Sequence, residues 1–251
     1  MTRRRRVRRR IQNIPFNKIV PNMITCGSVL CGVFSLIMTY QRQFVPSAII
    51  LVAAVFFDYM DGKVARSLGG SSAFGEELDS LADAISFGAA PAFLIYAKYI
   101  DMEGGMPGLL ATAFFTLCGV LRLARFNVTH VAGSFQGLPI PAAGMALVSL
   151  VIGGIPMPPV IAAAAMTALG ALMISAIPYG NLKLLRKGSI NKVKSLLLVT
   201  IAATCFAMLR EKAFLALIGI YIASGPLHID WGTWLTKDAD TEDEPMIHEE
   251  D

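Results

Sequence analysis

The chain has 251 residues, of which 55% are hydrophobic and only 16% charged, and its formal net charge is +4. Its mean hydropathy is +0.58, whereas a soluble domain carries about 25% charged residues, so the composition indicates an integral membrane protein. The four cysteines lie in apolar stretches without a C-x-x-C pair, and the three histidines show no H-E-x-x-H spacing. These patterns argue against a disulfide framework and against a zinc hydrolase.

The two ends of the chain carry opposite charge. Residues 1–13 contain seven arginines, and residues 227–251 end in an acidic run, so neither segment is expected to fold alone. Beside a membrane domain, the basic head is interpreted as an anchor to anionic lipid rather than as a nucleic-acid-binding segment. No short apolar run with a small-residue cleavage site follows the arginines, so no cleavable signal peptide is expected.

Residues 14–226 are predicted to form one all-α integral membrane domain, a polytopic helical bundle without an internal repeat. Its apolar runs are long enough to cross, or nearly cross, a bilayer of about 30 Å. They cover residues 20–40, 46–64, 78–99, 109–123, 140–155, 159–178, 195–209 and 213–225. The first six are interpreted as core spans and the last two as a C-terminal pair, and short connections favour antiparallel neighbours.

Lysine and arginine are concentrated on one side of these predicted spans. If the basic head is cytoplasmic, the loops after the second, fourth and sixth spans are cytoplasmic too. These loops hold Lys63, Arg66, Arg122, Arg125, Lys183, Arg186, Lys187, Lys192 and Lys194. The positive-inside rule therefore predicts a multi-pass protein of the cell membrane. The end of the second span and the start of the third would face the cytoplasm.

Four aspartates lie at these two span ends: Asp58, Asp61, Asp79 and Asp83. Helix spacing of three and four residues places each pair on one face. A carboxylate at mid-membrane costs about 2.5–3.5 kcal/mol, so four together require cations. Oxygen-only ligands favour Mg²⁺ or Mn²⁺ over zinc, and a pair of such ions can bind a diphosphate during an in-line displacement. The cluster predicts phosphoryl-type transfer, with a proton or divalent-cation path as the alternative.

Small residues and one arginine share these helix faces. Gly62, Ala65 and Gly75 would let a base or a phosphate approach the backbone, and Arg66 can hold phosphate oxygens bidentately. Alternatively, the small residues are helix-packing contacts and Arg66 is a flanking cation that snorkels to the surface.

From Asp58 onward the sequence reads D-x-x-D-G-x-x-A-R, eight further residues, and then G-x-x-x-D-x-x-x-D. This stretch resembles the signature of the CDP-alcohol phosphotransferase family, whose members transfer a phosphate-linked group from a CDP-activated donor to an alcohol and release CMP. The resemblance implies that Asp58, Asp61 and Asp79 bind metal. It also implies that Asp83 contributes to a second metal and acts as the general base, and that the protein forms a homodimer.

Three further stretches, PNMITCGSVLCG, LRLARFNV and GLPIPAAG, resemble the integral-membrane phosphatidylserine synthases. This implies transfer of the phosphatidyl group of CDP-diacylglycerol to L-serine. Direct attack is favoured because no Ser, Cys or His lies in an evident nucleophile–base arrangement. Glycerol 3-phosphate or inositol phosphate remains open as the acceptor. A divalent-cation transporter is the alternative outside the family, although its acidic groups should be spread along the membrane depth.

The substrate contacts are expected at the same side of the bundle. Arg122 and Arg125, spaced by three residues, are predicted to bind the serine carboxylate, and Asn127 can add a hydrogen bond. These arginines would equally suit positive-inside flanks. Asn22 and Thr25 are predicted to contact the cytidine or its ribose, because the first span begins on this side. Alternatively, Asn22 only helps to start the helix.

Overall fold

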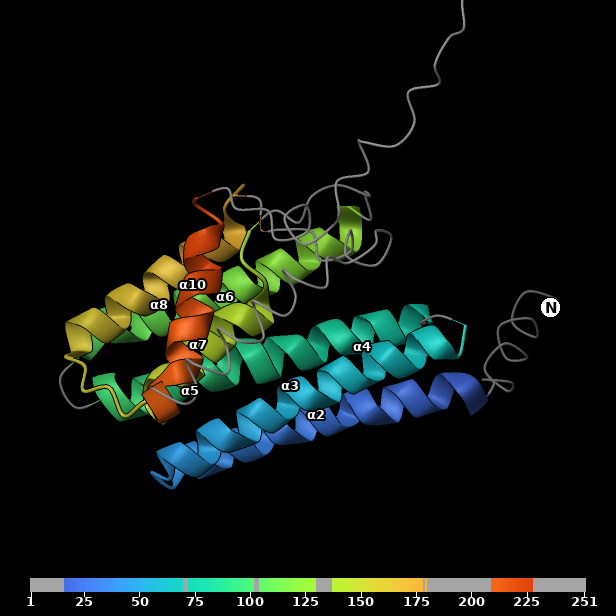
Figure 1. Cartoon of the computed structure of the whole chain (residues 1–251), viewed down its shortest axis with the longest axis horizontal. Coiled ribbons are helices and arrows are strands. Elements are labelled where there is room, and N and C mark those ends of the chain that lie inside the picture. Colours follow the sequence, from blue (N-terminus) through green and yellow to red (C-terminus); the bar gives the residue numbers. More distant parts are fainter. Residues whose placement is uncertain are drawn as a thin grey trace, which may run out of the picture.

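The computed structural model describes residues 16–69, 72–101, 104–129, 137–177, 179 and 209–227 (Figure 1). Every regular element in these residues is a helix, which confirms the predicted all-α architecture. The basic head, the acidic tail beyond residue 227, residues 183–194 and most of the predicted span 195–209 lie outside the described residues.

Among the described residues, four helical stretches are long and apolar enough to cross a membrane. They are α2 (Phe16–Tyr40), α3 (Phe44–Ser67), the run of α4 (Ala73–Asp83), η1 (Ala84–Ala89), α5 (Ala90–Ile95) and η2 (Tyr96–Ile100), and α6 (Gly105–Thr129). The shorter elements after them are α7 (Ile140–Ile152), α8 (Pro159–Ile174), η4 (Arg210–Lys212) and α10 (Ala213–Ser224). The protein is a multi-pass membrane protein, and the count of eight spans stays a prediction.

Helices α2 and α3 form an antiparallel hairpin and lie side by side (Figure 1). Buried hydroxyl groups join them near the turn, where Ser47 Oγ lies 2.8 Å from Ser35 Oγ and 2.7 Å from Thr39 Oγ1. Such bonds between membrane helices contribute about 0.6 kcal/mol each. In the turn itself, Arg42 forms an ion pair with Asp101 at 2.7 Å. The hairpin is therefore tied to the end of the third span.

The third span is not a continuous α-helix. Its backbone widens into π-helical turns at η1 and η2, a feature that often occurs near functional sites. The first of these begins directly after Asp83, and within it Ser86 Oγ donates a hydrogen bond to the carbonyl oxygen of Ser28 in α2 at 2.8 Å. This bond fixes the third span against α2 within one turn of the acidic residues.

Helix α7 packs on the other side of η1. A Cβ atom added to Gly144 would lie only 2.5 Å from the carbonyl oxygen of Phe87 and 3.1 Å from its Cα. The Phe87 side chain is fully buried, as is that of Ile140 at the start of α7. The two backbones are therefore in direct contact, and the acidic helix end rests on a densely packed core.

Gly144→Ala is expected to destabilise the bundle, because its methyl group must displace the η1 backbone. Overpacking of this kind costs about 1–3 kcal/mol and should lower the thermal midpoint of the protein in detergent, followed by intrinsic fluorescence. Gly219→Ala in α10 is the control, since a Cβ there meets nothing within 4 Å. Equal midpoints for the two variants would contradict the close contact between α7 and η1.

Candidate active site

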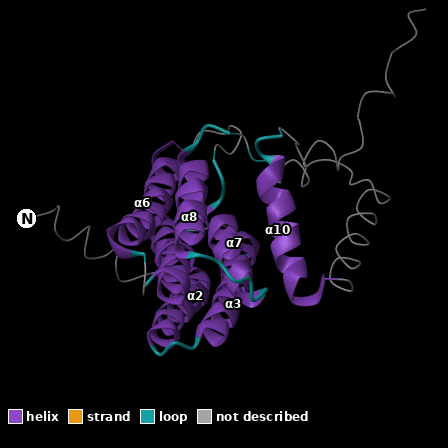
Figure 2. Ribbon diagram, turned by 90° about the vertical axis from the view of Figure 1, so that its left-hand side faces the viewer, coloured by secondary structure: helices purple, strands orange, loops and turns teal. Residues whose placement is uncertain are grey.

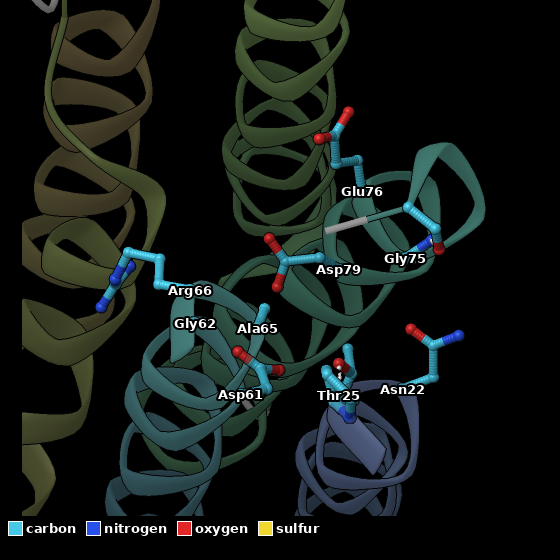
Figure 3. A pocket seen from close by; sticks show the side chains of 11 residues that line it. Asn22, Thr25, Asp61, Gly62, Ala65, Arg66, Gly75, Glu76 and Asp79 are labelled. Atoms are coloured by element: carbon cyan, nitrogen blue, oxygen red, sulfur yellow. Dashed lines mark hydrogen bonds between the residues drawn. The ribbon is translucent and has the colours of Figure 1, made fainter. Parts of the chain in front are cut away.

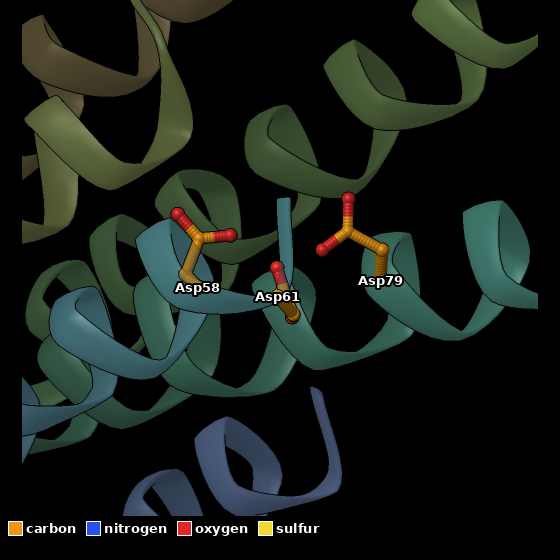
Figure 4. Close-up of side chains that lie close together, drawn as sticks. All are labelled: Asp58, Asp61 and Asp79. Carbon is orange, nitrogen blue, oxygen red and sulfur yellow. The ribbon is translucent and has the colours of Figure 1, made fainter. Parts of the chain in front are cut away.

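Three of the four aspartates converge from two helices. Asp58 and Asp61 lie near the end of α3, and Asp79 lies on α4. One carboxylate oxygen from each lies within 4.8 Å of the others, and Figure 4 shows the three side chains directed at a common space. The predicted spacing of three residues places Asp58 and Asp61 on one face of α3. The structure therefore brings together these three residues in an arrangement that could hold a metal ion.

The fourth aspartate lies deeper, at the junction of α4 and η1. Asp83 Oδ1 is buried without a hydrogen-bond partner in the described part of the chain, and the same is true of Asp61 Oδ2. Asp83 lies close enough to the other three aspartates and to Arg122 for their charges to interact. Buried carboxylate oxygens without partners are unfavourable unless a cation binds them. The oxygen-only donor set therefore fits a hard divalent cation.

A pocket adjoins this acidic cluster, between the start of α2, the end of α3 and the start of α4 (Figure 3). All six residues predicted to contact the nucleotide or its diphosphate line it, together with two of the aspartates. The lining residues are Pro21, Asn22, Thr25, Asp61, Gly62, Ala65, Arg66, Ser72, Gly75, Glu76 and Asp79. Residues far apart in the sequence thus form one concave surface beside the carboxylates.

The small residues of the pocket permit close contacts between side chains. A Cβ atom on Gly75 would lie 2.9 Å from Asn22 Oδ1, and one on Gly62 would lie 3.3 Å from an Arg66 guanidinium nitrogen. Thr25 is 4% exposed, and its hydroxyl donates to the carbonyl oxygen of Pro21 at 3.0 Å. Glycine at these two positions therefore keeps Asn22 and Arg66 at the pocket wall.

Three lining residues, Pro21, Ser72 and Glu76, are not among the predicted site residues. Ser72 is the N-cap of α4, and its hydroxyl accepts a hydrogen bond from the Gly75 backbone N–H at 3.1 Å. Glu76 precedes Asp79 by three residues, and in Figure 3 it lies across the pocket from Arg66. Helix spacing could have found Glu76, because residues three apart share a face. The position of Ser72 follows from its capping role, which is typical of serine.

The three residues predicted to bind the acceptor lie in different surroundings. Arg122 of α6 is half-buried, lies near Asp83, and has a buried Nε without a hydrogen-bond partner in the described residues. Arg125 is exposed. Asn127 Nδ2 donates to Ser80 Oγ on α4 at 3.0 Å. The structure therefore places Arg122 near Asp83 and joins Asn127 to α4, and the assignment of the three residues to the acceptor stays a prediction.

A family model described as CDP-alcohol phosphatidyltransferase matches residues 18–224. The chain belongs to this family. A CDP-diacylglycerol–serine O-phosphatidyltransferase of Helicobacter pylori is 33% identical over 226 residues, covering 84% of this chain and 92% of that protein. The Bacillus subtilis protein of the same name is 34% identical, and the match covers 65% of this chain and 91% of that protein. An archaetidylserine synthase of Methanothermobacter thermautotrophicus is 38% identical, and the match covers 64% of this chain and 69% of that protein. The family resemblance found in the acidic stretch is thus confirmed.

Replacing one converging carboxylate by an amide should weaken divalent-cation binding. We expect Asp58→Asn and Asp79→Asn each to lower the affinity for Mn²⁺ by at least about tenfold, since even residues behind metal ligands contribute about 10–100-fold. Electron paramagnetic resonance of the purified proteins titrated with Mn²⁺ measures free and bound ion. Asp101→Asn is the matched control, because this aspartate pairs with Arg42. Unchanged affinity in both test variants would contradict the metal assignment.

Proposed function

We propose that this protein transfers the phosphatidyl group of CDP-diacylglycerol to the hydroxyl group of L-serine, giving phosphatidylserine and CMP. The observation that carries the proposal is the three-carboxylate cluster beside a pocket lined by the family signature. Relatives named for serine transfer cover most of the chain and support serine as the acceptor. The same transfer to glycerol 3-phosphate or inositol phosphate has less support than transfer to serine. A role as a divalent-cation transporter has less support than either enzymatic function.

The donor is proposed to bind with its nucleotide in the pocket and its diphosphate beside the aspartates. Asn22 and Thr25 would contact the cytidine, and the absence of side chains at Gly62 and Gly75 would leave room for it. Arg66 at the pocket wall would bind a phosphate oxygen, a role suited to its planar fork of N–H donors. These assignments place the reacting phosphorus next to Asp83 and Arg122, which lie deeper in the same end of the bundle.

Two divalent ions, Mg²⁺ or Mn²⁺, are proposed to be held by the four aspartates. When bound, such ions polarise phosphoryl oxygens and neutralise the charge that develops on the attacking and leaving oxygens. Asp58, Asp61 and Asp79 would supply ligands for the first ion. Asp83 would share in the second, which suits its buried and unpartnered oxygen. The aspartates thus keep the donor diphosphate fixed while the acceptor approaches.

The transfer is proposed to be a direct displacement. The serine hydroxyl oxygen bonds to the phosphorus that carries the diacylglycerol, and the bond from this phosphorus to the bridging oxygen breaks, so that CMP leaves with that oxygen. Asp83 accepts the hydroxyl proton as a general base. Its position on a rigid helix junction, with α2 and α7 packed against η1, keeps the carboxylate oriented toward the reacting atoms.

The placement in the cell is also a proposal. The positive-inside pattern supports a cell-membrane protein whose aspartates face the cytoplasm, where a water-soluble acceptor can reach them. The match to residues 18–224 supports a catalytic membrane domain at 14–226, flanked by a basic head (1–13) and an acidic tail (227–251). A homodimer is proposed from the family resemblance.

The test is an acceptor panel. Purified protein is incubated with CDP-diacylglycerol, Mg²⁺ or Mn²⁺, and L-serine, glycerol 3-phosphate or inositol phosphate, and both CMP and the lipid product are quantified. We expect serine-dependent CMP release with formation of phosphatidylserine. Release with inositol phosphate but not serine would overturn the acceptor, and no release with any alcohol would overturn the enzyme assignment.

Asp83→Asn tests the proton transfer separately from donor binding. Loss of a general base typically lowers the rate by about 10²–10⁴-fold, so turnover should fall by this factor while CDP-diacylglycerol still binds, as measured by equilibrium binding of labelled donor. Glu77→Gln on the exposed side of α4 makes the same chemical change and should leave turnover intact. Wild-type turnover by Asp83→Asn would remove the base from the mechanism.

A further inference from the structure

Ser72 connects the pocket to the start of α4, and its hydroxyl group is only partly used. The residue is half-buried and lies in the pocket lining. Its backbone is extended, and its Oγ accepts a hydrogen bond from the Gly75 N–H at 3.1 Å. A serine hydroxyl can accept and donate at the same time. Within the described residues no acceptor takes the Ser72 hydroxyl hydrogen, so this hydrogen is available to a ligand.

The pocket lining contains a second hydroxyl group, on Thr25, but its hydrogen is already bonded. Thr25 donates to the carbonyl oxygen of Pro21 at 3.0 Å. This bond spans four residues within α2, which is a common arrangement for threonine inside a helix. Toward a ligand, Thr25 therefore offers its oxygen as an acceptor, whereas Ser72 offers a hydrogen.

A carboxamide group from α2 lies at the same part of the pocket wall. A Cβ atom on Gly75 would lie 2.9 Å from Asn22 Oδ1 and 3.3 Å from Ser72 Oγ, and Figure 3 shows the Asn22 side chain directed toward Gly75. Both polar groups thus meet at the surface of this glycine. A carboxamide has two N–H groups and a carbonyl oxygen. The pair therefore presents uncharged hydrogen-bonding groups of both kinds next to each other.

The charged groups of the pocket lie elsewhere. Among the lining residues that the structure describes, Arg66 is the one cation. In Figure 3 it lies on the opposite side of the pocket from Gly75 and Asn22, with Asp61 and Asp79 between them. A diphosphate suits a guanidinium and carboxylate-bound metal ions, whereas the hydroxyl groups and ring atoms of a nucleoside suit uncharged partners. The nucleoside therefore fits the side of the pocket that carries Asn22.

The later helices take no part in this wall. Of the pocket-lining residues in the described chain, none belongs to α7, α8 or α10. Figure 2 shows α10 standing beside α7 and away from α2. The polar groups that can reach a nucleoside in this pocket therefore come from the segment between residues 21 and 79.

We propose that Ser72 is a further nucleotide-binding residue, whose hydroxyl group donates a hydrogen bond to the nucleoside of CDP-diacylglycerol. This role rests on the proposed function, and Ser72 occupies none of the fixed positions of the acidic signature. Asn22 binds the same nucleoside from α2, while Ser72 Oγ continues to cap α4. Ser72 thus joins nucleoside binding to the start of the helix that carries Asp79.

The main test is Ser72→Gly, because glycine removes the hydroxyl group but remains an acceptable N-cap. Equilibrium binding of labelled CMP to the purified protein with Mn²⁺ should weaken by about three- to tenfold, the factor expected for one hydrogen bond between uncharged groups. The KM for CDP-diacylglycerol should rise by the same factor, whereas kcat and the KM for L-serine should change by less than about twofold. Ser72→Thr keeps the hydroxyl group and should restore CMP binding.

Ser67→Gly is the matched control for this substitution. Ser67 is exposed, lies outside the pocket lining, and donates its hydroxyl hydrogen to the carbonyl oxygen of Val64 at 2.8 Å. The same chemical change should therefore leave CMP binding at the wild-type level. Wild-type CMP binding by Ser72→Gly would overturn the proposal, as would an equal loss in Ser67→Gly or in Ser72→Thr.

Inorganic pyrophosphate separates contact with the nucleoside from contact with the phosphates. It carries the charge of the diphosphate without a nucleoside, so wild type and Ser72→Gly should bind it equally in the presence of Mn²⁺. Competition against labelled CMP measures its affinity for each protein. A loss as large as that for CMP would place Ser72 on the phosphates and contradict the proposal.

Mn²⁺ affinity without nucleotide separates binding from positioning. Electron paramagnetic resonance should give equal Mn²⁺ affinities for wild type and Ser72→Gly, because glycine disturbs the start of α4 only slightly. If Mn²⁺ and CMP affinities fell together, Ser72 would only position Asp79, and its proposed contact with the nucleoside would be wrong.

The outcomes also separate this role from the proposed function. If the wild type releases CMP with no alcohol and binds no CMP, both proposals fail. If it releases CMP with serine while Ser72→Gly keeps the wild-type KM for CDP-diacylglycerol, the role of Ser72 alone fails.

Discussion

The structure depends on the concentration of four carboxylates at one end of two membrane helices. Each is unfavourable near hydrocarbon, and their mutual repulsion grows as the surroundings become less polar. Two of their oxygens are buried without a partner in the described residues, so the fold forms a site whose stability improves when cations bind. The same helix ends carry small residues, and a Cβ atom on Gly75 or Gly62 would approach Asn22 or Arg66 closely.

Such a cluster needs a rigid support, and the packing around η1 provides it. Ser86 joins the third span to the α2 backbone, and Gly144 brings α7 against the carbonyl of Phe87. Asp83 lies directly before these contacts, where the helix changes from α to π geometry. A π-turn alters the direction of the side chains that follow it. The π-turn after Asp83 therefore determines which way Phe87 faces, while the α-helical spacing before it determines which way Asp79 and Asp83 face.

The sequence predicted the helical bundle and the acidic site because both depend on local spacing. Apolar runs define membrane helices, and intervals of three and four residues place aspartates on one face. The π-turns were missed because hydropathy does not report backbone hydrogen bonding. The grouping of Arg122, Arg125 and Asn127 was an argument from one helix alone. In the structure, Asn127 bonds to Ser80 on a neighbouring helix, and such a partner cannot be deduced from spacing.

The difference between local spacing and long-range packing also applies to the residues that form the site. The residues lining the pocket come from α2, α3, α4 and the segment before α4; eight of them lie within the acidic stretch 58–83 and three lie on α2. Arg122 of α6 lies outside this stretch and close enough to Asp83 for their charges to interact. On the proposed function, the donor side of the site therefore combines the acidic stretch with the start of α2, which lies about forty residues earlier in the chain.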